Sequence, residues 1–342
     1  MAGPKSSSNP ARLALVGGDT LLGKEIQEVL EGRKSRAVVI GYSASGEGNF
    51  GEQEGEPVYL EPLDAKAVAA DDAILLAGSV QGAQKAYALA KAAGGRPTVI
   101  DCTGQLEQQP EARIVAPLLG DSRRDAKWLL VIAHPAASAL ALILNRVARY
   151  RGIERTVAHI FEPASERGKH GVSELHLQTT NLLSFKPLEK TVFDAQLAFN
   201  LLPQYGHEAP QKLPAIEQQI ERHVATILAN DQQPGLPMPS LRLIQAPVFH
   251  GYSISAWIEF SSAVAIGELR EALASSQIEV RGPDEAAPDT VGAASQSGLT
   301  AGDIRIDHNN SRAVWIWIVC DNLRLTADAA ADLVSELRGP RA

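Results

Sequence analysis

Residues 12–32, RLALVGGDTLLGKEIQEVLEG, follow the order strand, tight turn, helix, and this stretch decides the fold class. Residues 13–16 are apolar, and two glycines follow at once. Beyond the turn, apolar side chains recur at the spacing of one helix face: Leu22, Ile26, Val29 and Leu30. Gly32 then provides a helix stop. A strand that leads through a tight turn into such a helix is the basic unit of an α/β domain.

The same alternation continues to about residue 133. Further short apolar strands are predicted at residues 37–43, 72–79, 97–102 and 128–133, with a helix at 80–95. Strands that are apolar along their length suit a parallel sheet buried on both faces. Helices of this length between them favour right-handed βαβ units. The sequence therefore predicts a Rossmann-type parallel-sheet domain over residues 12–134, preceded by a disordered leader at residues 1–11.

The pattern changes in residues 135–321, where strands follow one another without a regular helix between each pair. Strands are predicted at residues 155–163, 241–248, 252–260 and 313–321, and helices at 171–183, 214–228 and 265–275. This arrangement indicates an α+β domain with a mixed or antiparallel sheet. Residues 282–302 are poor in large apolar side chains and are predicted to form a flexible loop. A last helix, at residues 322–338, could pack on either domain.

The strand around residue 316 is apolar on both faces. Trp315 and Trp317 share one face, and the other is shared by Val314, Ile316 and Ile318. Such a strand needs cover on both sides. Helices can cover one side, and a second subunit would cover the other, with Trp257 adding to the apolar patch. We therefore expect a homodimer formed through residues 135–321, although a purely intramolecular core would also satisfy the pattern.

The composition restricts the class of partner. The 342-residue chain has a net charge of -8, which disfavours a nucleic-acid partner. No apolar run reaches the length of about 20 residues that spans a bilayer, and the N-terminal residues lack the apolar core of a signal peptide. Cys102 and Cys320 lie far apart in apolar segments, so nothing indicates a disulfide. These features predict a cytoplasmic globular protein without a membrane partner.

The turn after the first strand is a candidate dinucleotide site. A strand, a glycine-containing turn and a helix start could hold a pyrophosphate on backbone N–H groups. The candidate residues lie in this turn and in a second small-residue turn of the predicted sheet: Gly17, Gly18, Thr20, Leu21, Leu22, Gly23, Ala77, Gly78 and Ser79. Thr20 is bulky where a phosphate approaches, and a tight turn that binds nothing is an equal alternative.

The residues at the end of the second strand do not indicate whether NAD or NADP is preferred. Gly41, Tyr42 and Ser43 stand there, without an evident acid for a ribose or a base for a 2′-phosphate. We therefore expect weak or absent NAD(P) binding, with any residual preference for NAD.

Nine segments in fixed order carry a resemblance to a known family. They are GGDTLLG, LLAGS, VID, HPAAS, FEPASERGKHGVSELHLQT, AFNLLP, APVFHGYSISAWIEF, GDIRID and WIVCDNLR. In order and spacing the chain resembles the aspartate-semialdehyde dehydrogenase family, and PASERGK is similar to its Usg-type branch of paralogues. The resemblance covers the chain from about Leu13 to the last helix. It implies a Rossmann-type domain, a dimerisation domain, and a C-terminal helix that returns to the first domain.

The resemblance also implies a reaction whose residues are absent here. In the family a cysteine thiolate attacks the substrate, a histidine acts as acid and base, and a hydride passes to NADP. The nucleophile position matches Ala137 and the histidine position matches Tyr252. The arginine that grips the substrate carboxylate matches Gln245, and the glutamine beside the nucleophile matches Glu162. A phosphate-binding arginine matches Glu107, and a substrate-binding lysine falls roughly on Gln219.

Other chemistry in the same pocket stays open. Glu162, Tyr252, His250 and His223 could converge into a group that titrates or holds a metal. No close-spaced metal motif supports this, since His170 and His176 are six residues apart, and no metal is expected. The basic segment at residues 165–171 could bind an anion, line a dimer contact or be a solvated loop. Cys102 is interpreted as a small buried residue.

These observations favour a dimeric family member that lacks the parent dehydrogenase activity and has a regulatory or ligand-binding role. Two alternatives remain. One is an NAD(P)-dependent oxidoreductase that acts on an aldehyde or oxo group without a cysteine. The other is a structural subunit that pairs with an active relative.

Overall fold

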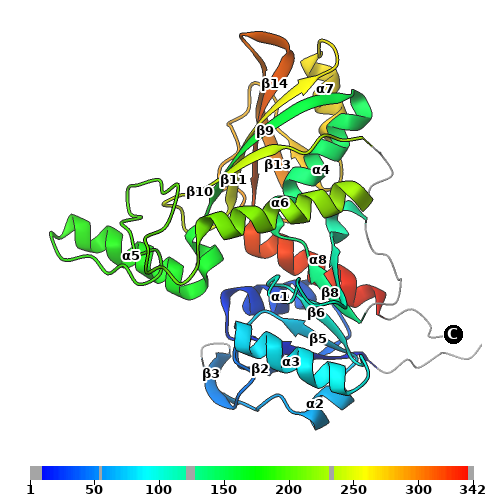
Figure 1. Ribbon diagram of the computed structural model, residues 1–342, viewed down its shortest axis with the longest axis vertical. Coiled ribbons are helices and arrows are strands. Elements are labelled where there is room, and N and C mark those ends of the chain that lie inside the picture. Colours follow the sequence, from blue (N-terminus) through cyan, green and yellow to red (C-terminus); the bar gives the residue numbers. More distant parts are fainter. Residues whose placement is uncertain (1–9, 54–55, 121–127, 231–234, 338–342) are drawn as a thin grey trace, which may run out of the picture. The chain divides into compact units, whose positions relative to one another are not determined.

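The computed structural model describes residues 10–53, 56–120, 128–230 and 235–337, and the chain divides into two units (Figure 1). Unit 1 comprises residues 1–117, 122–132 and 327–342, and unit 2 comprises residues 118–121 and 133–326. The predicted leader lies outside the described residues except for Pro10 and Ala11.

Unit 1 is built on a parallel sheet of six strands in the order β2-β1-β5-β6-β8-β7. The strands are β1 (Arg12–Val16), β2 (Val38–Tyr42), β5 (Ala73–Leu76), β6 (Thr98–Asp101), β7 (Ala112–Val115) and β8 (Leu129–Ile132). The helices are α1 (Leu21–Gly32), α2 (Ala65–Ala70) and α3 (Val80–Ala92). The predicted Rossmann-type sheet is confirmed. Sequence analysis ended the sheet at residues 128–133, but β7 pairs beyond β8 and forms the edge.

The sheet of unit 1 is buried on both faces, as the apolar strands predicted. Leu13 and Leu15 belong to one apolar cluster and Ala14 and Val16 to another, so alternate residues of β1 serve opposite faces. Helix α8 (Asn322–Glu336) joins the first cluster with its residues from Ala327 onward. The C-terminal helix therefore packs on the parallel sheet. A hairpin of β3 (Asn49–Gln53) and β4 (Glu56–Leu60), which sequence analysis missed, follows β2.

Unit 2 contains a mixed six-stranded sheet in the order β10-β9-β11-β14-β13-β12. The strands are β9 (Ile153–Glu162), β10 (Ser240–Gln245), β11 (Tyr252–Phe260), β12 (Ile278–Val280), β13 (Leu299–Asp307) and β14 (Asn310–Cys320). β9 pairs in parallel with β10 and β12 with β13, while the other pairs are antiparallel. The predicted mixed sheet is therefore confirmed.

Helices cover one face of this sheet. They are α4 (Pro135–Tyr150), α6 (Leu213–Asn230) and α7 (Ile266–Leu273), which pack on one another and on β9, β10 and β13 (Figure 1). Helix α5 (Gly168–Leu183) follows the short 3-10 helix η2 (Ala164–Arg167); a second 3-10 helix, η1, spans Pro117–Leu119. Ile254, Ile316 and Ile318 are fully or almost fully buried in the sheet, as their alternation predicts.

The tryptophan face of the sheet is half-buried. Trp257 and Trp315 face each other across β11 and β14, and both indole N–H groups donate to Asp307 Oδ2, at 2.8 and 3.0 Å. Trp317 donates to Pro288 O at 3.0 Å. The tryptophans lie on one face of the sheet and the isoleucines on the other, as predicted. The three indoles are half-buried, so the predicted apolar patch is less exposed than expected.

The prediction of a flexible loop over residues 282–302 is wrong at its C-terminal end. Residues 299–302 begin β13, where they pair with β12 and β14. Earlier residues are also tied to neighbours, since Ser295 N donates to Asp321 Oδ2 at 2.8 Å. Hydrogen bonds therefore hold parts of this segment in place, although it has few large apolar side chains.

Candidate functional site

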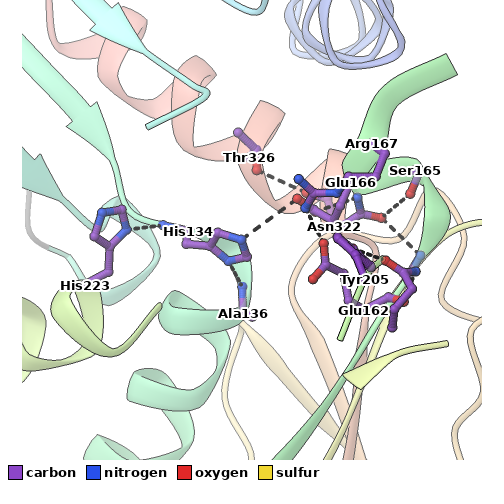
Figure 2. A network of polar contacts seen from close by, with 12 residues as sticks. His134, Ala136, Glu162, Ser165, Glu166, Arg167, Tyr205, His223, Asn322 and Thr326 are labelled. Atoms are coloured by element: carbon purple, nitrogen blue, oxygen red, sulfur yellow. Dashed lines mark hydrogen bonds and ion pairs between the residues drawn. The ribbon is translucent and has the colours of Figure 1, made fainter. Parts of the chain in front are cut away.

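The start of α4 is where the resemblance expects a nucleophile. His134 caps this helix, because its Nδ1 accepts the Ala136 N–H at 3.3 Å, and Pro135 takes the first helical position (Figure 2). The His134 N–H in turn donates to Nδ1 of His223, on α6, at 2.8 Å. Ala137 lies one residue further along and is fully buried. The position therefore presents only a methyl group.

A buried ion pair lies where β9 passes into η2. Glu162, the last residue of β9, is fully buried, and its Oε1 accepts from Nη2 of Arg167 at the end of η2 (Figure 2). The Arg167 side chain is only 8% exposed. Burial raises the pKa of Glu162, although the Arg167 charge opposes that shift. Glu162 Oε2 and Arg167 Nε have no hydrogen-bond partner among the described residues.

Glu166 is a second carboxylate beside this pair. Its Oε1 accepts from Nδ2 of Asn322, at the start of α8, at 2.8 Å, and its Oε2 lies 3.9 Å from Nε2 of His134 (Figure 2). Burial and the charge of Glu162 raise the pKa of Glu166 to about 7. Glu166 therefore titrates near neutral pH, which is the range useful to a general acid or base.

Two further candidate residues end in the same cluster. Gln245 is fully buried; its Oε1 accepts from the Tyr205 hydroxyl at 2.6 Å, and its Nε2 donates to Glu162 O at 2.8 Å. Tyr252 is fully buried, with its ring 5.9 Å from the His134 ring. Burial and the nearby Glu166 hold the pKa of Tyr252 well above its usual value. Tyr252 can therefore donate a proton in a hydrogen bond but does not act as a phenolate.

The structure brings together three of the predicted positions: Glu162, Gln245 and Tyr252 belong to one polar cluster at one end of the sheet of unit 2. His223 reaches it through the backbone of His134. His250 has no hydrogen bond or ion pair with the cluster among the described residues, so its expected convergence is not seen. Gln219 is half-buried on α6.

Glu107 belongs to unit 1, in the turns after β6, where its Oε1 accepts from Gln108 at 3.0 Å. His170 and His176 are both exposed on α5. No group of three or more metal-ligating side chains occurs in the part of the chain that the structure describes.

Sequence analysis missed four members of the cluster: Glu166, Arg167, Tyr205 and Asn322. The alternative of a solvated loop at residues 165–171 is wrong for Arg167, since the guanidinium is buried against Glu162. The signal was present in the printed sequence, because adjacent Glu166 and Arg167 directly follow a buried strand and Pro163.

Neither cysteine offers a thiolate. Cys102 and Cys320 are free and buried. Burial raises the pKa of both thiols far above neutrality, and the neighbouring Asp101 and Asp321 raise them further. The interpretation of Cys102 as a small buried residue is confirmed.

The candidate dinucleotide turn of unit 1 uses its small residues for packing. Gly17 has a φ of +91°, and a Cβ there would lie 2.6 Å from the backbone of Gly78. The Thr20 hydroxyl donates to Gly17 O and Ala77 O, at 2.8 and 2.9 Å, and accepts from Gly23 N at 2.9 Å. The prediction that Thr20 obstructs a phosphate is therefore wrong, because its side chain turns inward and joins the two turns.

The backbone N–H groups of Leu21 and Leu22 have no acceptor within the described residues and remain available to an anion. Asp19 lies in the same turn, and its Oδ1 is buried without a partner. This carboxylate opposes a pyrophosphate electrostatically. The turn therefore has the shape of a dinucleotide site but an unfavourable charge.

The second turn and the end of β2 are also packed together. Ser79 caps α3, its Oγ accepting from Gly82 N at 3.3 Å and donating to Ala44 O at 3.0 Å. The sequence showed no evident acid for a ribose or base for a 2′-phosphate near Ser43, and the fold brings an ion pair to the segment that follows β2. Ser43 Oγ donates to Glu47 O, and Glu47 Oε1 pairs with Lys85 of α3 at 2.7 Å. Lys85 is 42 positions further along the chain, so only the fold brings it there.

A doubly wound parallel sheet with small-residue turns, followed by an α+β unit with a mixed sheet, defines the class of two-domain Rossmann-type dehydrogenase folds. Residues 146–325 match the family model described as semialdehyde dehydrogenase, dimerisation domain. This match covers more than half of the chain, and the chain therefore belongs to the aspartate-semialdehyde dehydrogenase family.

Individual relatives agree along almost the whole length. Aspartate-semialdehyde dehydrogenase of Rickettsia bellii is 28% identical over 91% of this chain and 93% of its own. A USG-1 protein homolog of Pseudomonas aeruginosa is 28% identical over 96% and 98%. The solved structure of a probable aspartate-semialdehyde dehydrogenase from Pseudomonas aeruginosa is 27% identical, with a TM-score of 0.80 over 96% and 98%.

The solved structure of aspartate semialdehyde dehydrogenase from Candida albicans contains NADP. It shares 14% identity with this chain at a TM-score of 0.67, over 96% of this chain and 98% of that one, so the similarity is one of fold. No helix among the described residues is long and apolar enough to cross a membrane.

Proposed function

We propose that this chain is a homodimeric member of the family that does not carry out the parent dehydrogenation and instead has a ligand-binding or regulatory role. The observation that supports this most directly is the start of α4, where Ala137 presents a buried methyl group. A methyl group cannot attack a carbonyl or an acyl phosphate. Loss of a covalent nucleophile typically lowers the rate by several powers of ten.

The surrounding cluster supports the same proposal. Gln245 is neutral and its amide is already bonded to Tyr205 and to the backbone, so it offers no charge to a substrate carboxylate. Tyr252 is held as a neutral phenol. Arg167 is a cation in this cluster, but Glu162 neutralises it. The family reaction would need several of these residues to be different at once.

Turnover tests the proposal. Purified protein with aspartate semialdehyde, phosphate and NADP should form no NADPH above a no-enzyme control. Ala137→Cys alone should not restore a rate, because Gln245 and Tyr252 remain. A phosphate-dependent rate that persists through successive purification steps, at constant specific activity, would overturn the proposal.

The second unit supports the homodimer. The face that carries Trp257, Trp315 and Trp317 is half-buried in a single chain, and Val157 on the same sheet is 37% exposed. A two-fold contact through this unit should bury more than about 1,200 Å². Light scattering should give twice the chain mass of 36.4 kDa. A mass of one chain at micromolar concentration would contradict this.

The first unit supports only weak dinucleotide binding. The N–H groups of Leu21 and Leu22 would face a pyrophosphate, and the bound cofactor would supply a hydride acceptor. Asp19 lies beside those groups and repels the phosphates. Calorimetry should show NADP binding that is absent or weaker than micromolar, and Asp19→Asn should strengthen it. Sub-micromolar binding by the unmodified protein would contradict the proposal.

One observation favours a second candidate, an oxidoreductase that uses no cysteine. Glu166 has a pKa of about 7 and lies beside His134 and Tyr252, so a group able to exchange a proton is present. A panel of aldehydes and alcohols with NAD or NADP separates the two. A rate that Glu166→Gln abolishes would support this second candidate.

A further inference from the structure

A small cavity lies in unit 2, on elements that take no part in the cluster around Glu162. Its volume is about 210 Å³, and its lining comes from three places: α7, the segment that follows β12, and β13. The side chains that carry charge into it are Arg270, Arg281, Glu285 and Asp303. Pockets for drug-sized ligands usually exceed about 300 Å³. The cavity is therefore smaller than a usual drug-sized pocket and suits a small ligand or group.

Arg270 is the unexplained residue of this cavity. It lies in the last turn of α7, and its guanidinium has neither an ion pair nor a hydrogen bond within the described residues. Its Nε is buried from solvent and lacks an acceptor. A guanidinium carries five N–H donors, and a buried donor without an acceptor is costly. In native proteins such a group calls for an explanation, and a bound anion provides one.

Arg281 adds a second guanidinium to the lining of the cavity. Its Nη1 donates to Ala286 O at 3.2 Å, and its Nε is 3.4 Å from Glu279 Oε1. The side chain is only 26% exposed. Its Nη2 has no acceptor in the part of the chain that the structure describes. Both arginines can therefore offer donors to one small anion in this cavity.

The two carboxylates of the lining are engaged elsewhere. Glu285 Oε2 accepts from the Gly282 N–H at 2.5 Å and closes the turn after β12. Asp303 Oδ2 lies 3.6 Å from Nη2 of Arg305. Neither carboxylate pairs with Arg270. Arg270 is therefore the charged residue of this lining that lacks a partner among the described residues.

The part of β13 that lines the cavity has a strained backbone at Asp303. The pairing of β13 with β14 shifts between Gly302 and Arg305, which marks a β-bulge, and Asp303 within it has a φ of +44°. A non-glycine residue in this region costs of order 1–3 kcal/mol and persists where the surroundings enforce it. Bulges of this kind redirect side chains and gather near binding sites.

We propose that this cavity binds a phosphate group, as inorganic phosphate or as the end of a small phosphomonoester, between Arg270 and Arg281. The planar forks of the two guanidinium groups match the oxygens of a phosphate, and the unpaired charge of Arg270 favours an anion. The site is independent of the nucleophile position, so its failure would leave the proposed loss of dehydrogenase activity untouched.

Thermal unfolding of the full chain against phosphate concentration, at constant ionic strength, tests the site. Phosphate should raise the unfolding temperature along a saturable curve, since a ligand that binds only the folded state stabilises it. Arg270→Gln breaks no side-chain hydrogen bond or ion pair among the described residues and should weaken binding at least about tenfold, the effect of one charge-assisted hydrogen bond. Arg242→Gln, an exposed arginine on β10 of the same unit, is the matched control and should bind like the wild type.

Two further ligands test which kind of anion the cavity binds. Glycerol phosphate should compete with inorganic phosphate, whereas malonate at the same ionic strength should not. An equal shift in Arg270→Gln and the wild type, or no saturable shift in the wild type, would overturn the site. Stabilisation by malonate that also depends on Arg270 would overturn the assignment to phosphate.

Discussion

The turn between β1 and α1 and the cluster around Glu162 use their polar groups in opposite ways. In the turn, hydrogen bonds join residues that are mostly close in sequence, and the Thr20 hydroxyl and small residues hold two turns together. In the cluster, charged side chains from β9 and η2 are buried against one another and against the Asn322 amide of α8. The turn is held by uncharged groups, whereas the cluster holds a buried ion pair, and Glu162 Oε2 and Arg167 Nε still lack a partner among the described residues. The two regions therefore differ in what stabilises them: close backbone packing in the turn and buried charge in the cluster.

The largest expected loss of stability follows when the Glu162–Arg167 ion pair of the cluster is broken. Arg167→Gln leaves the Glu162 carboxylate buried without its cation, and removal of one partner of a buried pair typically costs about 3–5 kcal/mol. Urea unfolding followed by circular dichroism measures this loss.

The double variant Glu162→Gln/Arg167→Gln should recover part of that loss, because no charge is then left unpaired. Lys91→Gln, which breaks the exposed Lys91–Glu111 pair, is the control and should have a much smaller effect. If Arg167→Gln and Lys91→Gln lowered the free energy of unfolding equally, the buried pair would contribute no more to stability than the exposed pair, which would contradict the prediction.

The second-largest expected effect concerns the packing of Gly17 in the turn between β1 and α1. Gly17→Ala places a Cβ 2.6 Å from the Gly78 backbone at a φ of +91°, and strain and overpacking together should cost about 2–4 kcal/mol. Gly94→Ala is the matched control, since Gly94 has a φ of +75° with open space around it. It should cost only about 1 kcal/mol. Unfolding free energies that are equal for the two variants would contradict the tight packing of the two turns.

The smallest effect concerns pH. The folded protein holds a proton on Glu166 between its ordinary pKa of 4.5 and its raised pKa of about 7, whereas the unfolded chain has released it. Stability should therefore fall as pH rises through this window, by up to about 3 kcal/mol. Glu166→Gln should flatten this dependence and be the more stable protein at about pH 8. The exposed Glu154→Gln should follow the wild type, and a Glu166→Gln curve parallel to the wild type would refute the assignment.

Much of the fold could be predicted because its signals are local. The apolar runs of β1, β5 and β6 and the helix stop after α1 are visible in short windows of sequence. The alternation along β14 likewise separated Trp315 and Trp317 from Ile316. The edge strand β7 was missed because ARIV is short and mixed in polarity. Strands β12 and β13 were also missed, because IEV has only three residues and LTAGDIRID has few large apolar side chains.

The candidate site could be predicted only in part. Family positions at Glu162, Gln245 and Tyr252 indeed gather in one place. Arg167 was not expected there, because nothing in a sequence window shows that a charged residue after a strand is buried. Lys85 reaches the end of β2 only through the packing of α3. Pairs of this kind depend on long-range contacts that no periodicity encodes.

The native chain should have no thiolate able to act as a nucleophile. Reaction of the two cysteines with a chromogenic disulfide reagent at about pH 8 measures this directly. Neither Cys102 nor Cys320 should react in the native protein on the time scale on which both react in the unfolded chain, because burial raises the pKa of both thiols. Rapid, stoichiometric reaction of one cysteine in the native protein would contradict the claim.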